Sequence, residues 1–302
     1  MKNTKNKYSF LFPGQGSQHK GMGIENINKT KESFEFYALA KEVLGYNVLD
    51  ILNDDKLNQT LYTQPAIFIN SIIKDAILKK HNIYPNAVAG HSLGEFSALV
   101  SSEVLSFTNA LEIIKIRANE MENAGKENQG KMLAIIGATS DEIDQICSVG
   151  NILVPANFNS KDQTILSGDI DSVNKALLFC KTHNIGRAIP LKTSGAFHSP
   201  LMKNARNSLS KVIKSIDFKN AKVPIYQNTN PKPEKNADKI KFNLLKQLES
   251  PVQWLDSILS MVKNDCSNFI EVGPGKVLAN LNRRISNNIK TFEFDIETLK
   301  ND

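Results

Sequence analysis

The hexapeptide at residues 90–95, Gly-His-Ser-Leu-Gly-Glu, constrains the fold of this chain more than any other stretch. A short apolar run (residues 87–89) precedes it and a helix-like segment (residues 95–100) follows it. Glycine on both sides of Ser92 suits a strained, crowded turn, where a Cβ would collide with neighbouring backbone. The pattern predicts a nucleophile elbow that pushes the Ser92 hydroxyl outward beside the backbone N–H groups of a helix start. An isolated match also fits a plain strand-to-helix turn.

Composition is that of an ordinary globular protein. The chain has 302 residues, 41% hydrophobic and 23% charged, enough for one large domain or a main domain that carries a smaller one. The formal net charge is +6, but the lysines are spread along the chain without the dense basic stripe of a nucleic-acid binder. We therefore expect no nucleic-acid partner, and at most a mild attraction to anionic partners.

Targeting and redox signals point to the cytoplasm. No apolar run approaches the ~18–20 residues that span a bilayer, and the basic residues 1–7 lead into an apolar run too short for a secretion signal. The three cysteines, Cys147, Cys180 and Cys266, are far apart and lack histidine at metal-ligand spacing. They predict buried thiols, with neither a disulfide framework nor a metal site.

Strand and helix patterns alternate along the chain, which predicts an α/β fold with a mostly parallel sheet covered by helices. The expected strands of the main part are residues 8–12, 87–89, 223–226 and 268–271. A helix is expected over residues 64–80, with Pro65 in its first turn, and another over residues 106–124.

Residues 131–191 follow a different pattern. Strands are expected at 132–136, 152–156, 163–167 and 187–191, and helices at 140–147, with Ser140 as N-cap, and at 171–182. This βαββαβ order predicts an inserted ferredoxin-like subdomain. We expect it to cover residues 129–192, joined at 125–130 and 192–195 to a domain made of residues 1–128 and 193–302. A cleft between two such parts is a usual small-molecule site.

A serine nucleophile needs a base, and five histidines are available. His19, His81 and His183 lie in polar surroundings typical of surface residues, and His91 is expected to pack beside the turn. His198 lies in a loop bounded by glycine and proline, residues 194–200, just beyond the inserted unit. Such a loop can hold an imidazole over the cleft, so His198 is the candidate base.

Arg117 falls on the apolar face of the expected helix at residues 106–124, together with Ala110, Ile114 and Met121. A buried guanidinium needs an anionic partner. Two interpretations stay open: an internal salt bridge to an Asp or Glu, or a bidentate clamp for a substrate carboxylate.

Two further loops are rich in glycine. Residues 13–18 (PGQGSQ) would need a third glycine at His19 to make a dinucleotide fingerprint, and residues 273–276 (GPGK) lack the P-loop spacing. Both predict tight turns at strand ends. The first could supply an oxyanion N–H, as a loop from another strand does in α/β hydrolases.

Matching stretches run in order along nearly the whole chain: residues 12–18 (FPGQGSQ), 63–66 (TQPA), 90–95 (GHSLGE), Arg117, 157–159 (NFN), 197–200 (FHSP), 251–254 (PVQW) and 271–276 (EVGPGK). This series resembles the malonyl-CoA:acyl-carrier-protein transacylase family. The resemblance implies an α/β-hydrolase-like core with a ferredoxin-like insert, which agrees with the strand and helix patterns.

The resemblance also implies roles for residues. Ser92 would carry the malonyl ester, His198 would be its general base, and the backbone carbonyl of Gln247 would orient the histidine in place of a triad aspartate. The backbone N–H groups of Gln15 and Leu93 would form the oxyanion hole.

Four more residues are expected at the substrate pocket by resemblance. Arg117 would bind the malonyl carboxylate, and Asn228 and Met121 would line the same pocket. Phe197 would leave little space for an α-methyl group, which favours malonyl over methylmalonyl. Gln15 is expected to contact the substrate as well.

The expected reaction moves a malonyl group from malonyl-CoA to the phosphopantetheine thiol of acyl carrier protein for fatty acid biosynthesis. No cofactor, metal or membrane is expected, and family members imply a monomer. Three alternatives stay open: a trans-acting malonyl acyltransferase of a polyketide pathway, a serine esterase or thioesterase, and an inactive subunit that binds the carrier protein.

Overall fold

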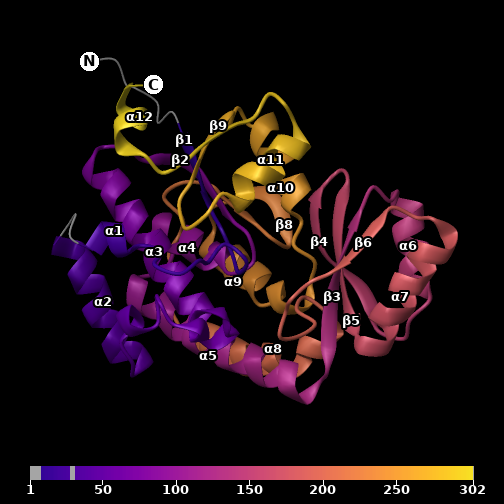
Figure 1. Ribbon diagram of the computed structural model, residues 1–302. Coiled ribbons are helices and arrows are strands. Elements are labelled where there is room, and N and C mark those ends of the chain that lie inside the picture. Colours follow the sequence, from indigo (N-terminus) through magenta and orange to yellow (C-terminus); the bar gives the residue numbers. More distant parts are fainter. Residues whose placement is uncertain (1–7, 28–30, 302) are drawn as a thin grey trace.

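The computed structural model describes residues 8–27 and 31–301, so the basic residues 1–7 lie outside the described residues. The larger part of the molecule is built on a six-stranded sheet (Figure 1) in the order β10-β9-β1-β2-β7-β8. All pairings are parallel except the antiparallel one between β7 and β8. The strands are β1 (Tyr8–Phe12), β2 (Pro85–Gly90), β7 (Ile225–Gln227), β8 (Asn230–Glu234), β9 (Asn268–Glu271) and β10 (Lys290–Phe292).

Helices cover both faces of this sheet, and the side-chain alternation of the strands shows why. Phe10 and Phe12 of β1 join a large core with helices α3, α4 and α5, whereas Leu11 joins a second core with α10 and α11. The helices of this part are α1 (Ile24–Ile27), α2 (Lys31–Leu44), α3 (Thr60–Lys80), α4 (Gly94–Ser101), α5 (Phe107–Glu127), α8 (Lys203–Ser215), α9 (Ala237–Leu244), α10 (Trp254–Lys263), α11 (Val277–Ile285) and α12 (Ile296–Asn301). Short 3₁₀ turns are η1 (Val48–Asp50), η2 (Asp55–Asn58), η3 (Pro200–Met202) and η4 (Gln247–Glu249). Among the described residues, none of the helices combines the length and hydropathy that crossing a bilayer requires.

One helix start was predicted wrongly. Helix α3 begins at Thr60, so Pro65 lies inside the helix and not in its first turn. The Thr63 hydroxyl donates to the carbonyl oxygen of Gln59 at 2.9 Å, which ties the added turn to the residue before it. The spacing of apolar residues does not report polar contacts of this kind, so it could not predict the earlier helix start.

The inserted unit has the predicted βαββαβ order (Figure 1). Its antiparallel sheet runs β4-β5-β3-β6, and it consists of β3 (Gly130–Ile136), α6 (Ser140–Ser148), β4 (Leu153–Ser160), β5 (Gln163–Asp169), α7 (Ile170–His183) and β6 (Arg187–Pro190). Thr139, not Ser140, is the N-cap of α6, because Thr139 and Glu142 form a reciprocal capping box. The α/β class with a mostly parallel main sheet and a ferredoxin-like insert is therefore confirmed.

Both faces of the inserted sheet are packed against other elements. Leu133 and Ile135 of β3 pack into a separate core under α6 and α7, while Met132 and Ala134 belong to the large core of the main part. The edge strand β4 also bonds to the segment before α10, through Val252 N to Ala156 O (2.8 Å) and Phe158 N to Val252 O (2.9 Å). These contacts fix the insert beside the carboxyl end of the main sheet.

The expected joint at residues 125–130 is shorter than predicted. Helix α5 continues to Glu127 and β3 begins at Gly130, so only residues 128 and 129 separate the two elements. The amphipathic pattern fades before the helix ends, since its last turn is largely exposed. The division into residues 1–128 with 193–302 and residues 129–192 stays a prediction.

The elbow has the crowding that its glycines indicated. Ser92 has a φ of +51°, in the left-handed region that favours glycine. A Cβ on Gly90 would overlap the backbone of Gly94, and one on Gly94 would overlap the carbonyl oxygen of Phe12 in β1. The backbone of β2 therefore lies in direct contact with the backbone at the start of α4, and this close packing holds Ser92 in its left-handed conformation.

We expect Gly94→Ala to lower the free energy of unfolding by roughly 3 kcal/mol, because its methyl group meets backbone that cannot move aside. Gly16→Ala is the control, since its φ of +103° is unfavourable but nothing lies near the added Cβ. It should cost only about 1 kcal/mol. Urea titration of both variants checks this, and equal losses would contradict the steric account.

Candidate active site

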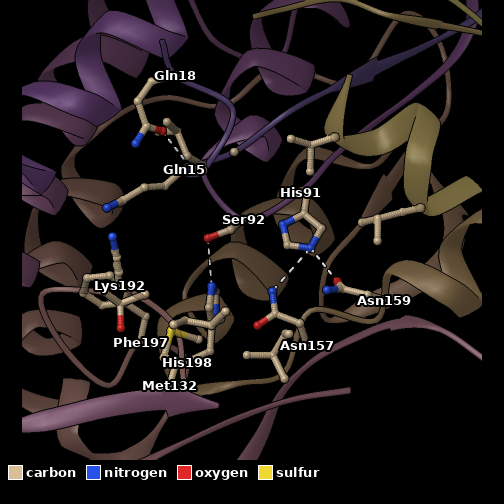
Figure 2. Close-up of a pocket in the computed structure, with 18 of the residues that line it drawn as sticks. Gln15, Gln18, His91, Ser92, Met132, Asn157, Asn159, Lys192, Phe197 and His198 are labelled. Atoms are coloured by element: carbon tan, nitrogen blue, oxygen red, sulfur yellow. Dashed lines mark hydrogen bonds between the residues drawn. The ribbon is translucent and has the colours of Figure 1, made fainter. Parts of the chain in front are cut away.

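A cavity of about 720 Å³ lies between the elbow and the inserted unit (Figure 2). The main part contributes the loop after β1 with Gln15, the elbow with Ser92, and the loop with His198. The insert contributes Met132 from β3 and Asn157 from β4. The cavity thus lies in the cleft where a small-molecule site was expected.

Ser92 and His198 face each other across this cavity (Figure 2), with Ser92 Oγ 2.8 Å from His198 Nε2. On the other side of the ring, His198 Nδ1 lies 3.0 Å from the carbonyl oxygen of Gln247 and 3.1 Å from that of Ser250. Two carbonyl acceptors require a proton on Nδ1, so Nε2 is free to accept from the Ser92 hydroxyl. In the described part of the chain, no carboxylate contacts His198.

Burial, and next to it the charge of the neighbouring Arg117 guanidinium, together lower the pKa of His198 to about 3. The imidazole is therefore neutral, and able to accept a proton, across the whole range in which the protein is expected to work. An ordinary histidine would lose this capacity below about pH 6.5.

We expect kcat/KM for malonyl-CoA to stay flat from about pH 8 down to about pH 5.5, because the free enzyme already holds His198 deprotonated. Initial rates at subsaturating malonyl-CoA in buffers of constant ionic strength measure this. A fall with a midpoint near pH 6.5 would contradict the low pKa.

Arg117 is buried, at 1% exposure, and its guanidinium points to the nucleophile. Nη2 donates to Ser92 Oγ at 3.0 Å and to Gln247 Oε1 at 3.3 Å, and Nη1 donates to Gln64 Oε1 at 2.7 Å. Burial lowers the pKa of Arg117 to about 10, so it stays a cation, and its Nε has no hydrogen-bond partner among the described residues. Within residues 8–27 and 31–301 no carboxylate lies within ion-pair distance of it, which argues against the internal salt bridge.

Backbone donors lie beside Ser92. The N–H of Leu93 at the start of α4 and that of Gln15 in the β1 loop have no hydrogen-bond partner among the described residues. A Cβ on Gly14 would overlap the carbonyl oxygen of His91 and lie 3.7 Å from Leu93 N, so the β1 loop lies directly against the elbow. Two free donors from separate segments at a nucleophile are the arrangement of an oxyanion hole.

Asn228 lies elsewhere than expected. It is not on the cavity wall but behind the elbow, where its Oδ1 accepts from the backbone N–H of Ser92 at 2.7 Å and its Nδ2 donates to Gly90 O. Its side chain therefore fixes the turn. Phe197 and Met121 do line the cavity, as the resemblance implied.

Three further features were not predicted. Gln64, inside the quoted stretch 63–66, bridges Arg117 and the Met121 sulfur, and Ser250 supplies the second carbonyl to His198. His91 does more than pack against Trp254: its Nε2 lies 2.9 Å from Asn159 Oδ1 and 3.3 Å from Asn157 Nδ2 (Figure 2). The polar residues of the quoted stretch 157–159 were the available signal.

These groups together suit acyl transfer. A hydroxyl nucleophile contacts a neutral base, two backbone N–H groups without a partner in the described chain belong to the segments beside it, and a buried cation without a carboxylate partner there faces the reacting oxygen. The cation indicates an acyl group that carries an anionic end, because an apolar acyl chain would leave the guanidinium without a counter-charge.

Residues 9–294 match the model of the acyl transferase domain. The chain is 37% identical to the malonyl CoA-acyl carrier protein transacylase of Staphylococcus aureus over 291 residues, which cover 94% of both chains. The crystal structure of an acyl carrier protein S-malonyltransferase from Vibrio cholerae superposes with a TM-score of 0.92, at 35% identity and over 98% of this chain and 99% of that one.

A third relative is a malonyl-transacylase solved in complex with a type II polyketide acyl-carrier protein. Its TM-score is 0.92 at 33% identity, and the match covers 97% of this chain and 98% of that one. Identity above 30% over nearly the full length of each relative goes well beyond a shared fold. This chain therefore belongs to the malonyl CoA-acyl carrier protein transacylase family of acyl transferases.

Proposed function

We propose that this protein transfers the malonyl group of malonyl-CoA to the phosphopantetheine thiol of an acyl carrier protein, through a malonyl ester on Ser92, for fatty acid biosynthesis. The observation that carries the proposal is the buried Arg117 guanidinium, 3.0 Å from Ser92 Oγ and without a carboxylate partner in the described chain. A relative solved with its carrier protein supports the acceptor.

The first half-reaction loads the enzyme. His198 Nε2 takes the Ser92 proton as Oγ attacks the thioester carbonyl, and the oxyanion forms against the N–H groups of Gln15 and Leu93. The intermediate collapses, the carbon–sulfur bond breaks, and the proton on His198 passes to the CoA thiolate. Carbonyl partners at Nδ1 suffice, because they hold the tautomer throughout.

The second half-reaction runs in the reverse sense. The phosphopantetheine thiol gives its proton to His198 Nε2 and its sulfur attacks the Ser92 ester. Collapse of the second oxyanion breaks the ester bond, and the proton returns to Ser92 Oγ. Over the two half-reactions the malonyl group passes from CoA to the carrier protein, and Ser92 and His198 return to their starting protonation states. The reaction therefore needs no cofactor or metal.

Selectivity would rest on Arg117 and Phe197. The malonyl carboxylate replaces neutral partners around the guanidinium, whereas an acetyl group leaves the cation unpaired at a cost of several kcal/mol. Phe197, on the cavity wall beside His198, leaves little space for an α-methyl group. We also propose that Met121 and Gln64 position the guanidinium fork.

The proposal also includes the compartment, the oligomeric state and the domain division of the protein. We place the protein in the cytoplasm, as a monomer, with the inserted unit as a separate domain over residues 129–192. The three free cysteines support a reducing compartment. The polyketide alternative uses the same site chemistry, and the acceptor carrier protein distinguishes it.

Incubation with malonyl-CoA and a phosphopantetheinylated carrier protein tests the proposal, with the carrier-protein mass as readout. We expect malonyl-carrier protein to accumulate and little free malonate to form. Malonate release at the same rate with and without the carrier protein would instead identify a thioesterase. No reaction of any kind would favour an inactive subunit that binds the carrier protein.

A further inference from the structure

Glu95, the last residue of the elbow hexapeptide, is a buried carboxylate for which the proposed reaction has no use. It lies in the first turn of α4 and is fully buried, at 0% exposure. In the described chain no Lys, Arg or His forms an ion pair with it. A carboxylate so placed is unfavourable unless hydrogen bonds satisfy it.

Three donors converge on Glu95. Gln227 Nε2 donates to Oε1 at 2.9 Å, and Oε2 accepts from the backbone N–H of Asn228 and from Gln247 Nε2, both at 3.0 Å. Burial raises the pKa of Glu95, and these three donors together with the charge of Arg117 oppose the rise.

Two of the three donors cannot be exchanged for an acceptor. The Asn228 donor is backbone, and Gln227 is fixed because its Nε2 also donates to Ile240 O and its Oε1 accepts from Asn243 Nδ2, both at 3.0 Å. A protonated acid or an amide would turn a proton toward one of them. These donors therefore favour the ionised carboxylate, against the effect of burial.

The Gln247 side chain connects Glu95 to Arg117, the cation proposed to bind the acyl group. The Gln247 amide donates from Nε2 to Glu95 and to the Ser92 carbonyl oxygen at 3.0 Å, so its Oε1 is turned to Arg117 Nη2 at 3.3 Å. The same Nη2 contacts Ser92 Oγ. A flipped amide would place two donors together at Arg117 and two acceptors together at Glu95.

We infer that Glu95 is a positioning residue for acyl selection: its carboxylate fixes the Gln247 amide so that the Arg117 guanidinium stays aimed at the acyl group on Ser92. This inference rests on the proposed malonyl transfer. A second contact acts on the elbow, since the Asn228 backbone held by Glu95 carries the side chain that binds Ser92 N.

Glu95→Gln keeps the size of the side chain and removes the charge. We expect kcat/KM for malonyl-CoA to fall about 10- to 100-fold, the usual effect of losing a hydrogen bond to a charged group. The loss should appear largely in KM, and acetyl-CoA should be affected less, so the malonyl-to-acetyl ratio should fall. The pH profile should keep its shape, because backbone carbonyls hold His198.

Asp75→Asn is the matched control. Asp75 is also a buried carboxylate, at 4% exposure, but it binds Lys79 (2.7 Å) and Ser101 (2.7 Å) where α3 meets α4, and no site residue contacts it. This variant should lose stability while it keeps the wild-type malonyl-to-acetyl ratio. A general effect of removing a buried charge is thereby separated from an effect on selection.

Gln247→Leu cuts the same connection from the other end and leaves the backbone carbonyl in place. It should lower the malonyl-to-acetyl ratio, and the double variant with Glu95→Gln should be no worse than the more damaging single variant. If Glu95→Gln does not fold, Gln247→Leu decides alone.

Failure of the inference and failure of the proposed function look different. Wild-type protein that transfers malonyl, with an unchanged acyl ratio in Glu95→Gln or in Gln247→Leu, overturns the inference. Wild-type protein that transfers no malonyl overturns the proposed function itself.

Discussion

Ser92→Ala should abolish the malonyl-enzyme adduct and lower the transfer rate by at least about 10⁴-fold. The change removes the oxygen that lies 2.8 Å from His198 Nε2 and 3.0 Å from Arg117 Nη2. The base would have no hydroxyl to deprotonate, and the oxyanion donors alone give only a small residual rate. Single-turnover rates with malonyl-CoA, together with the intact mass of the enzyme, measure the loss.

Ser97→Ala is the control for this variant. Ser97 is a buried serine on α4, the helix that follows the elbow, and its hydroxyl has no hydrogen-bond partner in the described chain, so its removal should leave both rate and stability nearly unchanged. A malonyl adduct that still forms on the Ser92→Ala protein would refute the nucleophile assignment.

Arg117→Ala should give the second-largest effect, a loss of roughly 10²- to 10⁴-fold in kcat/KM for malonyl-CoA. Truncating one partner of a buried charge pair costs about 3–5 kcal/mol, and the malonyl carboxylate would lose the buried counter-charge that Arg117 supplies. Acetyl-CoA has no carboxylate to lose, so the preference for malonyl should collapse. Parallel loading assays with the two thioesters give the ratio.

Two further variants show whether the loss comes from the Arg117 guanidinium itself: a control on the same helix and a conservative replacement. Lys115→Ala removes a cation from the exposed side of the same helix, where its Nζ donates to Val43 O, and should leave selectivity unchanged. Arg117→Lys keeps the charge but not the fork that reaches Gln64 and Ser92 together, so it should recover only part of the loss. Unchanged discrimination in Arg117→Ala would rule out the carboxylate clamp.

The buried parallel strands of this fold were predictable because each contains a short apolar run, residues 10–12 in β1 and residues 269–270 in β9. The expected strands at residues 8–12 and 268–271 match β1 and β9 at both ends. The edge strands β8 and β10 were missed. β8 reads Asn-Pro-Lys-Pro-Glu and β10 has three residues, so only their neighbours in the sheet make them strands.

Some features of the site were likewise predictable from the local sequence, and others depend on the folded structure. The motif around Ser92 and the burial of Arg117 follow from local pattern, and the structure brings both to one cavity with His198. The partners of Arg117 and His198 could not be predicted from local pattern, because Gln64 is 53 residues from Arg117 and the acceptors at His198 are backbone carbonyls. Every residue carries such a carbonyl, so only the folded loop selects Gln247 and Ser250. The catalytic roles themselves stay predictions.

The most direct test of the malonyl relay is the intact mass of the enzyme through one turnover. Wild-type protein mixed with malonyl-CoA should gain a single malonyl group, which peptide mapping should locate on Ser92. After removal of free malonyl-CoA, addition of phosphopantetheinylated carrier protein should return the enzyme to its starting mass while the carrier protein gains the malonyl group. A carrier protein that becomes malonylated with no enzyme adduct at any time, or an adduct mapped to another residue, would contradict the account.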